Sequence, residues 1–205
     1  LPSLIWHTKY FGVGTFSLLA PITDNNSRLL IEGNLITKHD GKKEVKTADG
    51  GVWRRAAQIT YVHITKDENG VEQLEAQGYM LSWWLNKRCI YPQIVATGTN
   101  QYLINLMVKI NCGSEAGTKR RFPLFTFLAQ ETIDGVAVEY ANEVYAQLGQ
   151  EVKARAQAGK LGYDILLNER ERMFGFYLYK GNDLTDTNTE GNTHCIFSKD
   201  FDNLN

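Results

Sequence analysis

The stretch AQITYVHITKDENGVEQLEAQGYM, Ala57–Met80, predicts a β-hairpin around which the rest of the chain can be placed. Its centre, Asp67–Gly70, is a strong turn signal because the Asn-Gly pair tolerates positive φ. After the turn the residues alternate in a strand pattern, with an inward set of Leu74, Ala76, Gly78 and Met80. Before the turn one face should carry Ala57, Ile59, Tyr61 and His63, and the other Thr60, Val62 and Ile64. Since both faces hold apolar residues, this strand should be central or covered on both sides.

Strand patterns extend to both ends of the chain. Leu4–Phe11 and Thr15–Ile22 are aromatic and β-branched runs joined through Gly12 and Gly14, which predicts a second hairpin. Near the other end, Tyr163–Leu167 and Met173–Tyr179 predict two strands joined by the charged tip Asn168–Arg172. Thr193–Ser198 is expected to form one more strand.

The middle third has helical spacing instead. Leu81–Lys87 predicts a short helix, and apolar residues from Leu103 to Ile110 recur at helical intervals after a capping hydroxyl at Thr97–Thr99. A longer helix is expected over Tyr140–Ala158, which ends at Gly159. The sequence therefore predicts an α+β fold that is mainly antiparallel β-structure with an inserted α/β region.

Composition excludes several classes of protein. The chain has 205 residues, and 22 Lys and Arg against 23 Asp and Glu give a formal charge of −1. This balance argues against a dedicated nucleic-acid binder, so we expect no sequence-specific binding of nucleic acid. No apolar run approaches the ~20 residues that cross a bilayer. We therefore expect no membrane anchor, and the start at Leu1 indicates a processed or trimmed product.

Residues that could carry catalysis or bind a metal are widely scattered. The cysteines lie at 89, 112 and 195 and the histidines at 7, 39, 63 and 194, so neither set has metal-ligand spacing. Glu169 and Glu171 imitate a carboxylate pair, but the flanking Arg170 and Arg172 favour a solvated charged turn. From the residues we expect no catalytic, cofactor-binding or metal-binding site.

Two features suggest binding. The basic triplet Lys119–Arg121 could contact nucleic acid or an acidic protein, although a solvated loop is the simpler reading. Trp83–Trp84 and the pair Tyr177 and Tyr179 could stack on sugars. On a helix, however, two adjacent tryptophans point about 100° apart and form no single platform. Packing in a core or a subunit interface is therefore the alternative role for these aromatic residues.

Five segments, in this order, resemble a known family. They are LIWHTKYFGVGTF (Leu4–Phe16), LLIEGNLITKHDG (Leu29–Gly41), LEAQGYMLSWWLNKRCIYP (Leu74–Pro92), GYDILLNERERMFGFYLYKGNDLT (Gly162–Thr185) and IFSKDFDNL (Ile196–Leu204). Together they resemble a siphophage tail protein family named after the thirty-seventh gene product of the Rhodococcus phage ReqiPepy6. No single segment is decisive, but the ordered set spans almost the whole chain.

The resemblance implies a structural role, because such proteins are similar to the baseplate hub of contractile-tailed phages. It implies a homotrimer that forms a ring at the tail tip and contacts distal tail, tail tube and tape measure proteins in the virion tail. Residues 1–90 and 183–205 would form a first β-barrel-like hub domain, and residues 91–182 an inserted α/β region. The resemblance implies neither an enzyme nor a cofactor, and we expect no cell-wall-degrading activity.

The family normally continues with a further barrel half after the segment that ends this chain, so we expect a fragment or an unusually short member. A different class of function stays open beside the hub. A carbohydrate-binding β-module for recognition of a host receptor would use the same exposed aromatic residues.

Overall fold

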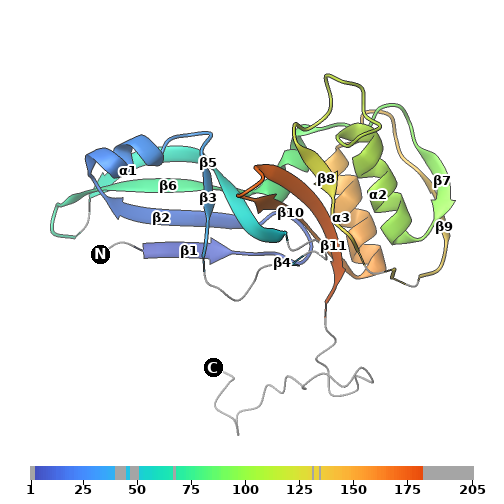
Figure 1. Ribbon diagram of the computed structural model, residues 1–205, viewed down its shortest axis with the longest axis horizontal. Coiled ribbons are helices and arrows are strands. Elements are labelled where there is room, and N and C mark those ends of the chain that lie inside the picture. The colour runs from blue at the N-terminus through green and yellow to red at the C-terminus, as the bar shows by residue number, and fades with distance from the viewer. Residues whose placement is uncertain are drawn as a thin grey trace, which may run out of the picture.

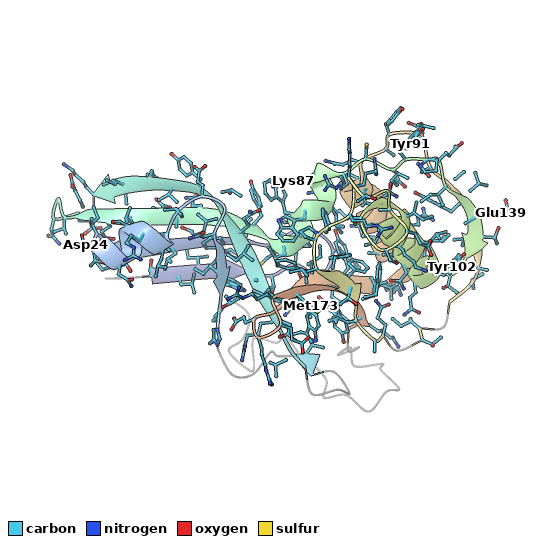
Figure 2. The ribbon with its side chains drawn as sticks, turned by 45° about the horizontal axis from the view of Figure 1, so that its top comes forward. Asp24, Lys87, Tyr91, Tyr102, Glu139 and Met173 are labelled. Carbon is cyan, nitrogen blue, oxygen red and sulfur yellow. The ribbon has the colours of Figure 1, made fainter. Side chains whose placement is uncertain are left out.

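A computed structural model describes residues 3–39, 45–46, 51–66, 68–130, 132–133 and 135–181, and shows a mixed fold built mostly of strands (Figure 1). The principal sheet has the strand order β1-β2-β6-β5-β10-β11-β8, with β3 and β4 also paired to β5. This sheet and its helices make two lobes, which Figure 1 shows side by side along the longest axis. Figure 2 shows Asp24 at one end of the molecule and Tyr91, Tyr102 and Glu139 at the other.

One lobe, here called the sheet lobe, is built around the hairpin of β5 (Val52–Lys66) and β6 (Glu72–Met80). β2 (Thr15–Pro21) pairs with β6, and β1 (Ser3–His7) pairs with β2 at the edge. α1 (Asp24–Leu29) and β3 (Leu35–Thr37) follow β2 along the chain. The predicted inward set on β6 is confirmed, because Leu74, Ala76, Gly78 and Met80 are all buried.

The predicted face pattern of β5 is wrong beyond Ile59. A β-bulge between Ile59 and Tyr61 inserts one residue into β5 relative to β6, which reverses the side to which later residues point. Val62 therefore packs with the core of Phe16, Ala57 and Ile59, whereas Tyr61 moves to the opposite, accessible face. Strict alternation cannot anticipate such an inserted residue.

The other lobe, here called the helical lobe, adds β10 (Leu161–Asn168) and β11 (Met173–Lys180), the hairpin that the sequence predicted. β8 (Phe125–Phe127) pairs in parallel with β11, and β4 (Val45–Lys46) pairs with the start of β5. The 3₁₀ helix η1 (Leu81–Lys87) follows β6, as predicted. β7 (Val95–Gly98) and β9 (Val138–Ala141) form a separate two-stranded sheet.

Two helices cover the β10–β11 pair. α2 (Asn100–Asn111) begins at its cap Thr99, where the sequence placed it, and α3 is Leu148–Gly159. Their buried apolar residues share one core with the strands; the largest members include Leu103, Ile104, Met107, Leu148, Ile165, Phe176 and Leu178.

The structure corrects two further predictions, the start of the long helix and the closure of the barrel. The long helix predicted from Tyr140 starts only at Leu148, because Tyr140 belongs to β9 and Tyr145 has a left-handed φ of 67°. Among the described residues, the sheet of β1, β2, β6, β5 and β3 forms a curled half-barrel rather than the expected barrel. The predicted strand Thr193–Ser198, with residues 183–205 of the expected first domain, lies outside the described residues.

Candidate functional site

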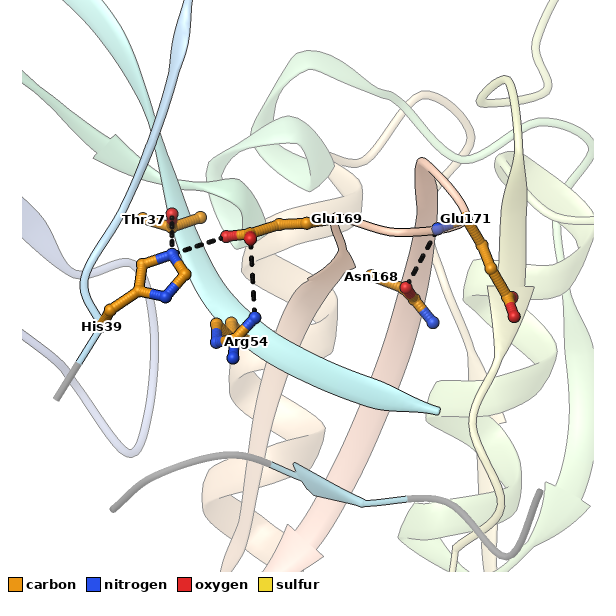
Figure 3. Close-up of polar contacts among 6 residues, drawn as sticks. All are labelled: Thr37, His39, Arg54, Asn168, Glu169 and Glu171. Carbon is orange, nitrogen blue, oxygen red and sulfur yellow. Dashed lines mark hydrogen bonds and ion pairs between the residues drawn. The ribbon is translucent and has the colours of Figure 1, made fainter. Parts of the chain in front are cut away.

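A cluster of polar side chains lies where the β10–β11 turn meets the end of β3; it comprises Thr37, His39, Arg54 and Glu169 and is here called the turn cluster (Figure 3). His39 Nε2 lies 3.1 Å from Glu169 Oε1 and 3.2 Å from Thr37 Oγ1. Arg54 Nη1 donates to Glu169 Oε2 at 3.5 Å. A hydrogen bond from Thr37, helped by the charges of His39 and Arg54, holds the pKa of Glu169 below its usual value.

The side chains of Glu169 and Glu171 point in different directions (Figure 3). The side chain of Glu169 faces the turn cluster, whereas that of Glu171 points away from it (Figure 3). The backbone N–H of Glu171 donates to Asn168 Oδ1 at 3.1 Å, which fixes the turn. A hollow of about 480 Å³ adjoins this turn and β5. The turn cluster thus joins segments that are about 130 residues apart, and its carboxylate is occupied by internal contacts.

A second polar network lies between the lobes and includes a buried ion pair. Arg55 Nε donates to Asp164 Oδ2 at 2.6 Å, and Arg55 Nη2 donates to the Tyr179 hydroxyl at 3.3 Å. Burial raises the pKa of Asp164 in spite of the opposing attraction of Arg55. The hydroxyl of Tyr10 donates to the Lys160 carbonyl at 2.8 Å and accepts from the Gly181 N–H at 2.7 Å. This network ties β5, β10 and β11 to the segment that follows β1.

The structure gives the predicted aromatic residues different surroundings. Tyr177 stacks on Tyr179 with ring centres 5.5 Å apart, but Tyr179 also contacts Tyr10 and Arg55. This pair therefore packs within the protein rather than forming a free platform.

Trp83 and Trp84 point in different directions, as predicted for adjacent residues of a helix. The indole N–H of Trp84 donates to Gln58 Oε1 at 2.9 Å, and its ring packs on Phe174. Trp83 instead stacks on Tyr79 at 5.1 Å, and Lys87 Nζ lies 3.8 Å from its ring centre. The two tryptophans form no shared surface.

The basic triplet Lys119–Arg121 is partly occupied by internal contacts. Arg120 donates to the Cys89 carbonyl and, at 2.9 Å, to Asn111 Oδ1. Arg121 Nε donates to the Ala116 carbonyl at 2.7 Å. Two of the three cations therefore hold the loop after α2 in place.

We examined the described ranges for groups of metal ligands and for a reactive thiol. Within those ranges no three His, Cys, Asp or Glu side chains lie close enough together to hold a metal ion. Burial raises the pKa of Cys112 to about 12, so its thiol is a poor nucleophile. His194 and Cys195 lie outside the described residues. None of the described helices is both long and apolar enough to cross a membrane.

Comparison with known families gives one decisive result. A family model described as "Siphovirus ReqiPepy6 Gp37-like protein" matches residues 2–205. The chain belongs to this siphovirus Gp37-like family. A search of curated proteins gives no match. Membership of the Gp37-like family points to a siphovirus structural protein and hence to a component of the virion.

One surface feature of this Gp37-like chain was not anticipated from its sequence. A groove of about 450 Å³ runs over the accessible face of β1, β2, β6 and β5, and Tyr61 and Tyr79 lie in its lining. Tyr61 lies there because of the bulge in β5, and a bulge has no signature in the alternation of this strand.

Proposed function

We propose that this chain is a structural component of the phage tail tip, the hub at the distal end of the tail tube, and that it assembles there as a homotrimeric ring. The observation that carries the proposal is the family match over residues 2–205. In this assembly residues 1–90 and 183–205 act as the hub domain and residues 91–182 as the inserted α/β region. Its other partners are the distal tail, tail tube and tape measure proteins.

The edge of the principal sheet supports assembly through strands. No described strand pairs with the outer edge of β1, and we propose that the N–H and C=O groups along that edge pair with a strand of another subunit. β1 has the sequence SLIWH, without the Lys or Pro that commonly protects an edge. Its Leu4 is 41% exposed, which suits a contact between subunits.

The polar groups support a structural role rather than catalysis, and we propose that the chain is not an enzyme. Catalysis requires an acid, base or nucleophile that can reach a substrate. The carboxylates of Glu169 and Asp164 instead bind neighbouring side chains that connect β3, β5 and β10. These contacts stiffen the junction between the lobes, as a component of a tail under load requires.

Labelling of intact particles tests the location. Gold-labelled antibody raised against the purified chain is applied to virions of the phage that encodes it. We expect gold at the end of the tail remote from the capsid. Labelling of the capsid, or along the whole tube, would contradict a tail-tip hub.

A further inference from the structure

The accessible face of the sheet lobe differs in character from its core face. The core face packs Phe16, Ala57 and Ile59 against Leu30 and Ile36. On the opposite face Tyr61 is 51% exposed and Ile5 is 53% exposed. The groove on this face, here called the sheet groove, holds about 450 Å³, within the roughly 300–1,000 Å³ typical of small-molecule sites. Its lining residues are Ile5, His7, Thr15, Phe16, Ser17, Thr60, Tyr61, Gln77, Gly78 and Tyr79.

Two aromatic rings lie on neighbouring strands of the sheet groove. Tyr61 on β5 is opposite Gln77 on β6, and Tyr79 is two residues further along β6. This diagonal relation separates the two residues by about 7–8 Å, which suits adjacent rings of one extended ligand. Without the bulge in β5, Tyr61 would point into the core and the second ring would be lost.

Hydrogen bonds hold the polar lining in a defined orientation. Gln77 Nε2 donates to Glu75 Oε1 at 2.6 Å, and Ser17 Oγ donates to the same oxygen at 3.2 Å. The other oxygen of Glu75 lies 3.1 Å from His63 Nε2. This contact fixes the amide of Gln77 within the lining of the sheet groove. The hydroxyl groups of Thr15 and Thr60 lie in the same lining.

The charges of the sheet groove favour a neutral ligand. Among the described residues that line it there is no Asp, Glu, Lys or Arg, and His7 contributes an imidazole. The carboxylate of Glu75, which accepts from the lining residue Gln77, is also engaged by His63. A ligand with many hydroxyl groups and flat apolar faces matches rigid phenol rings interleaved with amide and hydroxyl groups.

We propose that the sheet groove binds a neutral oligosaccharide, with sugar rings on Tyr61 and Tyr79 and hydroxyl groups bonded to Gln77. This activity is additional to the hub role and does not depend on it. Trp83 supplies a built-in reporter, because it stacks on Tyr79 with 22° between the planes. A sugar that packs on Tyr79 should change the fluorescence of this tryptophan.

The test uses the full chain and a set of neutral glycans: cellohexaose, maltohexaose, chitohexaose and an array of neutral bacterial-surface oligosaccharides. Binding is followed by calorimetry and tryptophan fluorescence up to about 10 mM, where a site of millimolar affinity is largely filled. We expect saturable binding of at least one glycan, weakened about tenfold or more by Tyr61→Ala and by Gln77→Ala. The matched control is Tyr102→Ala, which removes a tyrosine that is also 51% exposed but lies on α2.

Three results would overturn the proposal. The first is the absence of saturable binding across the whole set of glycans. The second is binding that Tyr61→Ala and Tyr102→Ala weaken equally. The third is that the chain binds none of the glycans and that Tyr61→Ala lowers its oligomeric mass. This result would identify the sheet groove as a contact between subunits. Because the mass of the wild-type chain tests the hub role separately, either proposal can fail alone.

Discussion

Among single residues, Arg55 and Asp164 matter most for the junction of the two lobes. The side chain of Asp164 is 9% exposed, and Arg55 Nε lies 2.6 Å from its Oδ2. Arg55→Met keeps most of the apolar stem but leaves a buried carboxylate without its cation. We expect the free energy of unfolding to fall by about 3 kcal/mol at neutral pH, measured by urea unfolding.

The pH dependence of that loss provides a second check. Burial raises the pKa of Asp164 above its unfolded value, so this carboxyl favours the folded state when protonated. Stability is then lost as the pH rises from about 4 through the folded pKa, and Arg55→Met should be less harmful near pH 4 than near pH 8. Lys66→Met is the control, because Lys66 and Glu72 form an exposed pair whose loss costs less than about 0.5 kcal/mol. Equal effects of the two substitutions would refute the role assigned to Arg55.

The pKa of Glu169 is lowered, so its effect on stability has the opposite pH dependence to that of Asp164. Its lowered pKa means that the carboxylate stabilises the fold above its unfolded pKa of about 4.3, and that this contribution disappears as the pH falls through the folded pKa. Glu169→Gln should therefore lower the melting temperature at pH 7 and have little effect at about pH 2–3. Glu171→Gln, on the same turn but outside the turn cluster, should leave the melting temperature unchanged at both pH values. A pH-independent effect of Glu169→Gln would be inconsistent with this account.

Side-chain roles could be predicted from the sequence only where they depend on local geometry. The divergence of Trp83 and Trp84 follows from their adjacency on a helix, and the structure confirms it. The partners of Glu169 could not be predicted, because His39 comes from a segment 130 residues away. The position of Tyr61 depends on one inserted residue that hydrophobic alternation does not reveal.

Among the elements, α2 depends on the residue that caps its start, Thr99. Thr99 Oγ1 accepts from the Tyr102 N–H at 3.2 Å, which satisfies one of the N–H groups that a helix start leaves unpaired. Thr99→Ala should lower the free energy of unfolding by about 1 kcal/mol, measured by urea unfolding followed by circular dichroism. Thr97→Ala, two residues earlier on exposed β7, is the matched control. An effect no larger than that of the control would exclude capping by Thr99.

α2, which has regular apolar spacing and a capping Thr99, was predicted well, and so was the short helix η1, which has no side-chain cap. The expected helix from Tyr140 was too long because its apolar residues happened to continue the helical period backwards. That segment contains the end of β9 and then Tyr145, whose left-handed φ interrupts any helix. Periodicity therefore identified the helix but not its first residue.

For the whole molecule, the α+β class was predicted from the alternation of strand-like and helix-like patterns along the chain. Closure of the barrel could not be predicted in this way, because it is not a local property of the sequence. Whether a curled sheet closes depends on which distant strands pair, and the described strands leave β1 at an open edge. That open edge, together with membership of the siphovirus Gp37-like family, is the basis for expecting assembly with further copies.

The most direct test of the hub proposal is the absolute mass of the chain in solution, measured by light scattering over a range of concentrations. We expect a trimer with three times the chain mass of 23.2 kDa, and electron microscopy of that species should show a ring. A strict monomer at every concentration would contradict self-assembly into a ring.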